Sequence, residues 1–149
     1  MLKKNYFFIY IIIIFFLIYK INIKKNIKIK KDPLKQIKYL ENGRKLYFIY
    51  CSNCHQKDAT GLKNLIPSLN NKNKLPKFID KTILIIKNGI YEKIIINNKL
   101  YNNQLMPNNK KLKNIEIAEI TTYLYNKWGE KKNIIITAND VNEVLENIN

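Results

Sequence analysis

The sequence predicts a small all-α domain of three to four short helices, preceded by an N-terminal transmembrane helix. The chain begins with an uninterrupted apolar and aromatic run, Tyr6 to Tyr19. Two later segments, 34–51 and 114–128, carry apolar residues at helical intervals. The segments between them contain the Asn pairs and prolines that favour loops. A domain this small, with so few helices, buries little apolar surface, so we expect a further component at its centre.

Residues 1–23 are predicted to form a membrane anchor. The run from Tyr6 to Tyr19 has 14 residues, fewer than the ~20 that a spanning helix usually needs. Two isoleucines just beyond it extend the run, and flanking lysines can reach the interfaces with their long side chains. A cleaved signal peptide is the alternative, but no small-x-small pattern follows Leu17. We therefore expect an uncleaved anchor.

A lysine-rich linker follows the anchor and covers residues 24–35. From Leu34 a helix is expected to continue as far as the first cysteine. Its apolar positions recur at helical intervals, namely at Ile37, Leu40, Tyr47 and Tyr50/Cys51. This helix opens the soluble domain, which we assign to residues 36–129.

The middle of the domain is predicted to be mostly loop. Residues 52–77 contain glycine, two prolines and a polar Asn- and Lys-rich stretch. Asp80 is expected to cap a short apolar helix that Gly89 terminates. Residues 94–109, with three Asn pairs and Pro107, are expected to be irregular.

A clear amphipathic helix closes the domain. Asn114 is its expected N-cap, and Gly129 follows its end. Its apolar stripe comprises Ile117, Ile120, Leu124 and Trp128. Residues 130–149 form a C-terminal tail, in which Thr137 and Asp140 resemble a capping box before a short acidic helix.

The charge of the chain is strongly positive. Lys and Arg number 27 against 11 Asp and Glu, a formal net charge of +16. The lysines are spread along the chain, without a basic cluster interleaved with aromatic residues, which argues against nucleic acid as a partner. A/T-rich codons are a sufficient cause of much of the Lys, Asn and Ile excess. The charge still steers encounters with acidic partners.

The motif CSNCH at residues 51–55 contains the two cysteines and the one histidine of the chain. A zinc site needs four ligands, which these residues alone do not supply. A thioredoxin-like dithiol normally follows a strand, whereas this pair follows a predicted helix. A disulfide between Cys51 and Cys54 leaves His55 unexplained. Cys-x-x-Cys-His is the specific signal for c-type haem attachment.

Met106, within QLMPN, is the one methionine besides the initiator, 51 residues after His55. A histidine-ligated haem iron either keeps an open sixth position, as in ligand-binding proteins, or takes a second ligand such as Met, as in electron carriers. Most methionines only pack against neighbours. The uniqueness of Met106, the adjoining proline and its position before the last helix favour the role of axial ligand.

Residues 38–129 resemble the class I cytochrome c domain, and in particular the small membrane-anchored monohaem cytochromes and oxidase-associated cytochrome subunits of bacteria. Five stretches carry the resemblance, in the order and at the spacing of the family: GRKLYFIYCSNCH, IPSL at 66–69, IIKNGI at 85–90, QLMP and IEIAEITTYLYNKWG. The fold that this resemblance implies is a small cytochrome c fold, with its helices wrapped around one haem.

The resemblance implies one covalently bound haem c per chain. Cys51 and Cys54 would carry the thioether bonds, with His55 and Met106 as axial ligands of the iron. The carbonyl of Pro67 would accept a hydrogen bond from the other ring nitrogen of His55.

The resemblance also implies a close helix crossing at Gly43, and the sequence departs from the family at three positions where glycine is common. Gly43 would permit a close crossing of the first and last helices, where Tyr47 packs. Glycines that commonly follow the haem motif are replaced by Gln56, Ala59 and Asn64.

The function that follows is that of a one-electron carrier, not an enzyme, between a quinol-oxidising complex and a terminal oxidase. A haem subunit bound within an oxidase, and a haem enzyme or gas sensor with an open sixth site, are the alternatives. Because c-type haem is attached outside the cytoplasmic membrane in this family, we expect a single-pass protein of the cytoplasmic (inner) membrane. Its haem domain would face the periplasm.

Overall fold

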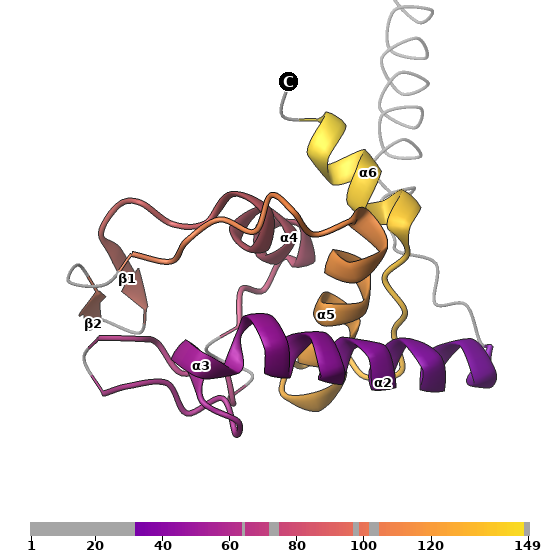
Figure 1. Cartoon of the computed structure of the whole chain (residues 1–149), viewed down its shortest axis with the longest axis horizontal. Coiled ribbons are helices and arrows are strands. Elements are labelled where there is room, and N and C mark those ends of the chain that lie inside the picture. The colour runs from indigo at the N-terminus through magenta and orange to yellow at the C-terminus, as the bar shows by residue number, and fades with distance from the viewer. Residues whose placement is uncertain (1–31, 64, 72–74, 97–98, 102–104, 148–149) are drawn as a thin grey trace, which may run out of the picture.

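The computed structural model describes residues 32–63, 65–71, 75–96, 99–101 and 105–147. The predicted anchor, the linker up to residue 31 and Asn64 lie outside these residues. Within them, no helix is long and apolar enough to cross a membrane. The elements, in order, are α2 (Pro33–Tyr50), α3 (Ser52–His55), α4 (Ile79–Asn88), β1 (Ile94–Ile96), β2 (Lys99–Tyr101), α5 (Asn114–Lys127) and α6 (Ala138–Glu146) (Figure 1).

The described part of the chain is mainly helical, as expected, but the all-α prediction is wrong at one place. Residues 94–101, expected to be irregular, contain two short antiparallel strands that pair Ile94 with Tyr101 and Ile96 with Lys99. Three consecutive isoleucines and a Leu-Tyr pair are strong strand formers.

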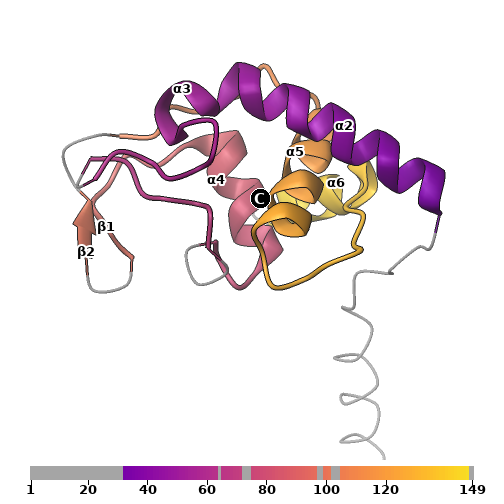
Figure 2. The ribbon, with the colours of Figure 1, turned by 90° about the horizontal axis from the view of Figure 1, so that it is seen from below.

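Helix α2 begins one residue before its predicted start and lies across α5 (Figure 2). Asp32 caps it by accepting a hydrogen bond from the Lys35 amide at 3.1 Å, with proline at the first helical position. A Cβ atom added to Gly43 would overlap the carbonyl oxygen of Glu119, so the two backbones touch. The close crossing predicted at Gly43 is therefore present.

The buried face of α2 differs from the predicted one. Tyr39, Gly43 and Tyr47 are buried, whereas Ile37 is 55 % exposed. Positions four residues apart share one helix face, and the face that contains the glycine comes closest to α5. Of the predicted stripe Tyr47 is buried, but the rest of the buried face follows the position of Gly43 and not the aliphatic residues.

An aromatic cluster fills the crossing. The ring of Tyr47 lies 5.8 Å from that of Tyr123 and 5.5 Å from that of Trp128, between ring centroids. Beside the cluster, the amide of Asn42 donates to the Glu119 carboxylate at 2.8 Å. These contacts join the first and last helices of the domain, as the sequence implied for Tyr47.

The N-caps of α4 and α5 are not the residues that the sequence predicted. Helix α4 starts at Ile79 after Phe78, so Asp80 lies in its first turn and is not the N-cap. Helix α5 has Lys113 at its N-cap, and the Lys113 amide donates to the Glu116 carboxylate at 2.7 Å. Asn114, the predicted cap, is instead the first helical residue and binds Asn142 of α6.

The C-terminal tail covers one side of α5. Ile134, Ile135 and Ile136 are buried, and the Ile136 amide donates to the Thr122 hydroxyl at 2.9 Å. The predicted capping box of α6 is present: the Thr137 amide donates to Asp140 at 2.7 Å, and the Asp140 amide donates to the Thr137 hydroxyl at 3.3 Å. The tail is therefore part of the folded domain.

Replacing Gly43 with Ala should separate α2 from α5. An alanine in a helix interior normally stabilises relative to glycine by about 1 kcal/mol. Here the added methyl group meets the backbone of α5, so we expect the free energy of unfolding to fall by about 3 kcal/mol. Urea titration followed by circular dichroism measures this change. Lys45→Ala, on the exposed face of the same helix, is the control, and a Gly43→Ala protein as stable as this control would contradict the close crossing.

Candidate functional site

The two cysteines and the histidine lie on one turn at the end of α2. Cys51 ends α2 and begins α3, so the loop predicted from residue 52 starts four residues later. The His55 amide donates to the Cys51 carbonyl at 2.9 Å, which closes this turn. Cys51 is half-buried and Cys54 is exposed, and no disulfide joins them. A helical turn therefore presents all three side chains within one short stretch of backbone.

The imidazole of His55 is buried and held by one backbone contact. Its Nδ1 atom lies 3.1 Å from the carbonyl oxygen of Pro67. Because a carbonyl can only accept, Nδ1 carries the proton, and Nε2 of the neutral ring keeps a lone pair. Burial lowers the pKa of His55, although the bond to Pro67 acts in the opposite direction. The ring is therefore neutral at neutral pH, with Nε2 available as a metal ligand.

Met106 is positioned by the end of α4. Its amide and carbonyl pair with those of Ile90, at 3.0 and 2.8 Å. Gly89 has a φ of 76° and approaches the Met106 carbonyl so closely that a Cβ atom there would overlap it. Glycine adopts this backbone conformation without strain. The glycine after α4 therefore serves two purposes, ending the helix and admitting the methionine segment.

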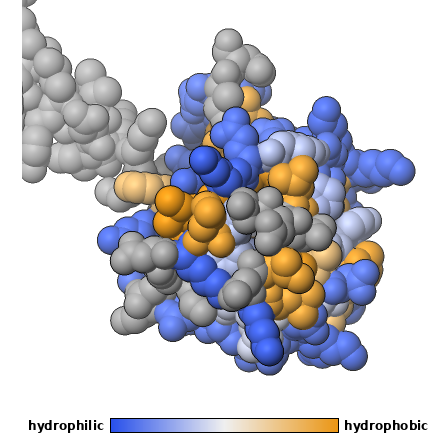
Figure 3. All heavy atoms as spheres, turned by 90° about the vertical axis from the view of Figure 1, so that its left-hand side faces the viewer, coloured by the Kyte–Doolittle hydropathy of each residue, from blue (hydrophilic) through white to orange (hydrophobic). Residues whose placement is uncertain are grey.

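All five residues predicted for the site line one cleft, which encloses about 710 Å³ of atom-free space, part of it open to solvent. The other lining residues are Tyr50, Leu65, Ile66, Ile90, Glu92, Ile94, Tyr101, Leu105, Pro107 and Asn109. Most of these side chains are apolar. Figure 3, which faces the end of the molecule where the hairpin lies, shows apolar side chains gathered between hydrophilic ones.

Within the described residues, no three His, Cys, Asp or Glu side chains lie together as ligands for a metal ion. The cleft instead brings together two thiols, one imidazole and one thioether.

A family model described as cytochrome c oxidase, cbb3-type, subunit III matches residues 39–124. The match covers more than half of the chain and includes every predicted site residue.

The chain belongs to this cytochrome c family.

Membership implies electron transfer by a protein with covalently bound haem c. No curated protein matches the chain.

The residues of this cytochrome's cleft fit a haem c. An imidazole nitrogen and a thioether sulfur are ligands that haem iron takes in cytochromes c. The lining is apolar, as a porphyrin ring requires, and Leu65 and Leu105 are 47 % and 48 % exposed at the cleft. Large apolar side chains left half in water are unfavourable, and a bound apolar group would cover them.

The turn after the haem motif has the backbone expected where the family commonly has glycine. Gln56 has a φ of 68° and Ala59 a φ of 61°. The hydroxyl of buried Tyr47 donates to the Gln56 carbonyl at 2.7 Å, and burial raises the pKa of this tyrosine far above its usual value. The Gly61 amide donates to the His55 carbonyl at 2.9 Å. These bonds hold the chain in a left-handed turn despite its side chains.

Two parts of the cytochrome's site were not predicted from the sequence. The hairpin contributes Ile94 and Tyr101 to the cleft. Its second strand also carries Lys99, whose ammonium donates to the carbonyl of Lys63 at 2.8 Å. The isoleucine run at 94–96 was a signal for the strand, but no sequence pattern pairs Lys99 with a backbone carbonyl 36 residues away.

Replacing Gln56 with Gly should stabilise the cytochrome. The backbone of Gln56, with φ 68° and ψ 161°, lies in a region that is essentially restricted to glycine and costs about 1–3 kcal/mol for other residues. After subtraction of the larger unfolded-state entropy of glycine, we expect a gain of about 1 kcal/mol. Urea titration measures it.

The control is Gln36→Gly, because Gln36 lies within α2 and also donates to Asn126 at 3.4 Å. That change should destabilise by about 1 kcal/mol or more. Equal losses in both variants would show that Gln56 is not strained.

Proposed function

We propose that this cytochrome is a one-electron carrier of a respiratory chain. One haem c would be attached through Cys51 and Cys54, and His55 and Met106 would be the axial ligands of its iron. The observation that supports this proposal is that both thiols, the imidazole and the thioether line a single apolar cleft. A haem bound there supplies one-electron chemistry, by the change of its iron between Fe(III) and Fe(II).

His55 would ligate through Nε2, and Pro67 would fix how it does so. The Pro67 carbonyl oxygen accepts a hydrogen bond from the Nδ1–H group of His55, at 3.1 Å. Such a bond fixes the tautomer and the ring orientation and makes the ligating nitrogen more basic. The chain thus prepares the imidazole as a ligand through its own backbone.

Met106 would decide between electron transfer and ligand binding. A thioether in the sixth position leaves no site for an added ligand and raises the reduction potential. The pairing with Ile90 holds the Met106 backbone at the cleft. An open sixth site, as in a haem enzyme or gas sensor, requires that the Met106 sulfur stay away from the iron.

The partners would be respiratory redox proteins, a quinol-oxidising complex as donor and a terminal oxidase as acceptor. The matching family is described as an oxidase subunit, which favours an oxidase as the acceptor. It equally supports a second candidate, a haem c subunit bound within the oxidase. A net charge of +16 would steer this cytochrome toward acidic partner surfaces in either case.

The location would be the cytoplasmic (inner) membrane, with the haem domain in the periplasm. The apolar run from Tyr6 to Tyr19 supports a single-pass anchor at residues 1–23. A tether of this kind keeps the carrier close to membrane-bound donors and acceptors.

Replacing Met106 with Ala should lower the reduction potential. Axial ligands set haem potentials over a range of about 0.8 V, so we expect a fall on the order of 0.2 V. The variant should also bind carbon monoxide readily in the reduced state, which the wild-type protein should not. Redox titration and absorbance spectroscopy measure both effects. Leu105→Ala, one residue away in the same cleft, is the control, and a Met106→Ala spectrum identical to wild type would favour the open-site alternative.

The protein should remain in the membrane fraction after an alkaline wash, with its N-terminus intact by mass spectrometry. Such a wash releases a protein that is held at the membrane surface only by charge, whereas it does not release a protein with a helix inserted in the bilayer. Ile12→Lys with Ile13→Lys is the control, because each lysine at the centre of a span costs about 3 kcal/mol. A mature chain that begins near Lys20 would identify the segment as a signal peptide.

A further inference from the structure

Two segments that are far apart in the sequence line the cofactor cleft, and the part of the cleft between them is called its mouth. One is the loop of residues 61–63 and 65–67, which follows His55, and the other is the hairpin of β1 and β2, which precedes Met106. Each proposed ligand is hydrogen-bonded to a residue near it: His55 binds the loop through the Pro67 carbonyl, and the Met106 backbone pairs with Ile90. These bonds do not fix the distance between the two sides. A contact across the mouth is needed for that.

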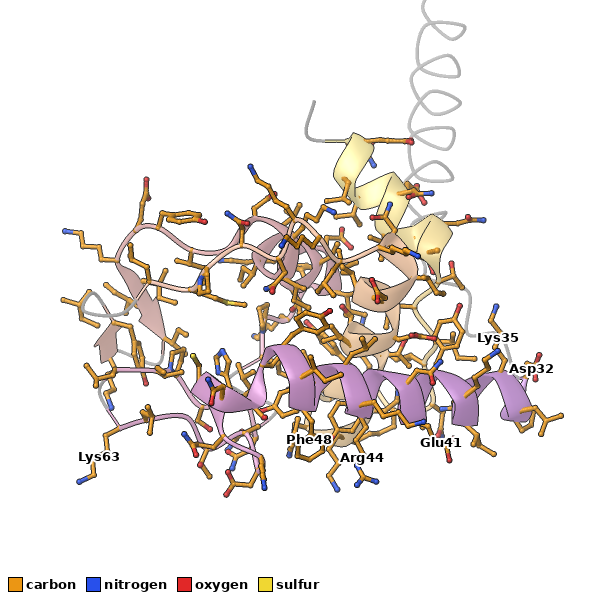
Figure 4. The ribbon with its side chains drawn as sticks, in the orientation of Figure 1. Asp32, Lys35, Glu41, Arg44, Phe48 and Lys63 are labelled. Atoms are coloured by element: carbon orange, nitrogen blue, oxygen red, sulfur yellow. The ribbon has the colours of Figure 1, made fainter. Side chains whose placement is uncertain are left out.

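Lys99 makes such a contact. Its Nζ atom donates to the carbonyl oxygen of Lys63 at 2.8 Å, and it lies 5.4 Å from the centre of the Tyr101 ring. Lys63 belongs to the loop, and Figure 4 places it at the same end of the molecule as the hairpin. A hydrogen bond from an ammonium group is stronger than one between neutral groups, and the aromatic face adds a cation–π attraction.

The position of Lys99 in the hairpin is unusual for a lysine. Ile94 and Tyr101 are paired and line the cleft, and residues two apart in a strand share a face, so Ile96 and Lys99 are on the cleft side. The outward pair is apolar: Ile95 is 72 % exposed and Leu100 is 47 % exposed. A one-sided sheet normally has the reverse arrangement, with polar residues outward. Solvation therefore does not explain why the lysine shares the face of Ile94 and Tyr101, whereas its bond to the carbonyl of Lys63 does.

The acceptor is also held in place. Lys63 has a φ of 33°, a left-handed conformation that is unfavourable for a residue with a side chain. It persists where the surrounding structure determines it. On one side the loop is closed by the antiparallel bridge between Leu62 and Ile66, with amide–carbonyl distances of 3.0 and 3.1 Å. On the other side the Lys63 carbonyl meets the ammonium group of Lys99.

We propose that Lys99 is a positioning residue that clasps the hairpin to the loop across the mouth of the cleft. The clasp keeps β1 and β2, which carry the cleft-lining side chains of Ile94 and Tyr101, against the loop, and so keeps the wall beside Met106 in place and water out of the cleft. This inference rests on the proposed function, in which Met106 and His55 are the axial ligands. Loss of the clasp frees the hairpin and makes the methionine easier to displace.

The test uses the full-length, haem-loaded protein in detergent. Lys99→Met removes the donor but keeps the length of the side chain, and Lys99→Arg keeps a cationic donor. Lys93→Met, an exposed lysine immediately before the hairpin, removes the same charge as a matched control. Two quantities are measured: hydrogen exchange of the amides in β1 and β2, and the rate at which added imidazole displaces Met106, followed by absorbance.

Lys99→Met should accelerate both processes about tenfold, which corresponds to about 1.4 kcal/mol. Lys99→Arg should restore both to within about twofold of wild type, and Lys93→Met should change neither. Equal behaviour of Lys99→Met and Lys93→Met would overturn the clasp. Faster hairpin exchange without faster imidazole binding would overturn the role in holding Met106.

The proposed function can fail separately. A wild-type protein without a methionine-ligated spectrum would refute the ligand assignment, and imidazole binding would then report nothing on Met106. The hairpin amides exchange whether or not Met106 binds iron. Their comparison between Lys99→Met and Lys93→Met therefore still decides whether the clasp exists.

Discussion

The contact between the backbones of α2 and α5 at Gly43 fixes where the cofactor site lies. Helix α2 continues from this crossing without a break to Cys51, so the position of the crossing determines the position of the first thiol. One turn beyond Gly43, Tyr47 packs in the aromatic cluster and its hydroxyl holds the carbonyl of Gln56. The residue after the haem motif is thereby tied to the helix crossing. Two backbones in contact thus transmit the geometry of the helix pair to the whole turn 51–55.

The apolar character of the cleft determines which kind of group the site suits. A domain of this size buries little apolar surface of its own, and Leu65 and Leu105 at the cleft are 47 % and 48 % exposed. Covalent attachment suits such a site, because it retains the group even when the walls open. The proposed attachment also gives a reason why the thiols and the imidazole are neighbours in the sequence, since all three would act on one group. The isoleucine-rich tail adds core against α5, and none of its residues lines the cleft.

The sequence predicted which side chains meet at the site better than the shape around it. The motif 51–55 follows from a local pattern of fixed spacing, whereas the contact of His55 with Pro67 and the place of Met106 at the same cleft follow from the resemblance to the cytochrome c family. The buried face of α2 did not, because tertiary contact at a glycine overrode the aliphatic pattern. The hairpin was missed because its asparagine pair signals a turn and a loop equally well. The bond from Lys99 to the Lys63 carbonyl depends on how two distant segments meet, and a backbone acceptor leaves no mark in the sequence.

The central claim is that the turn 51–55 carries a covalently attached haem. The most direct measurement is the mass of the intact chain after denaturation and extraction with acidified acetone. The account predicts that the chain keeps the mass of one haem, and that Cys51→Ser with Cys54→Ser loses it. A wild-type chain of bare polypeptide mass, with its haem in the extract, would contradict the assignment of these two thiols.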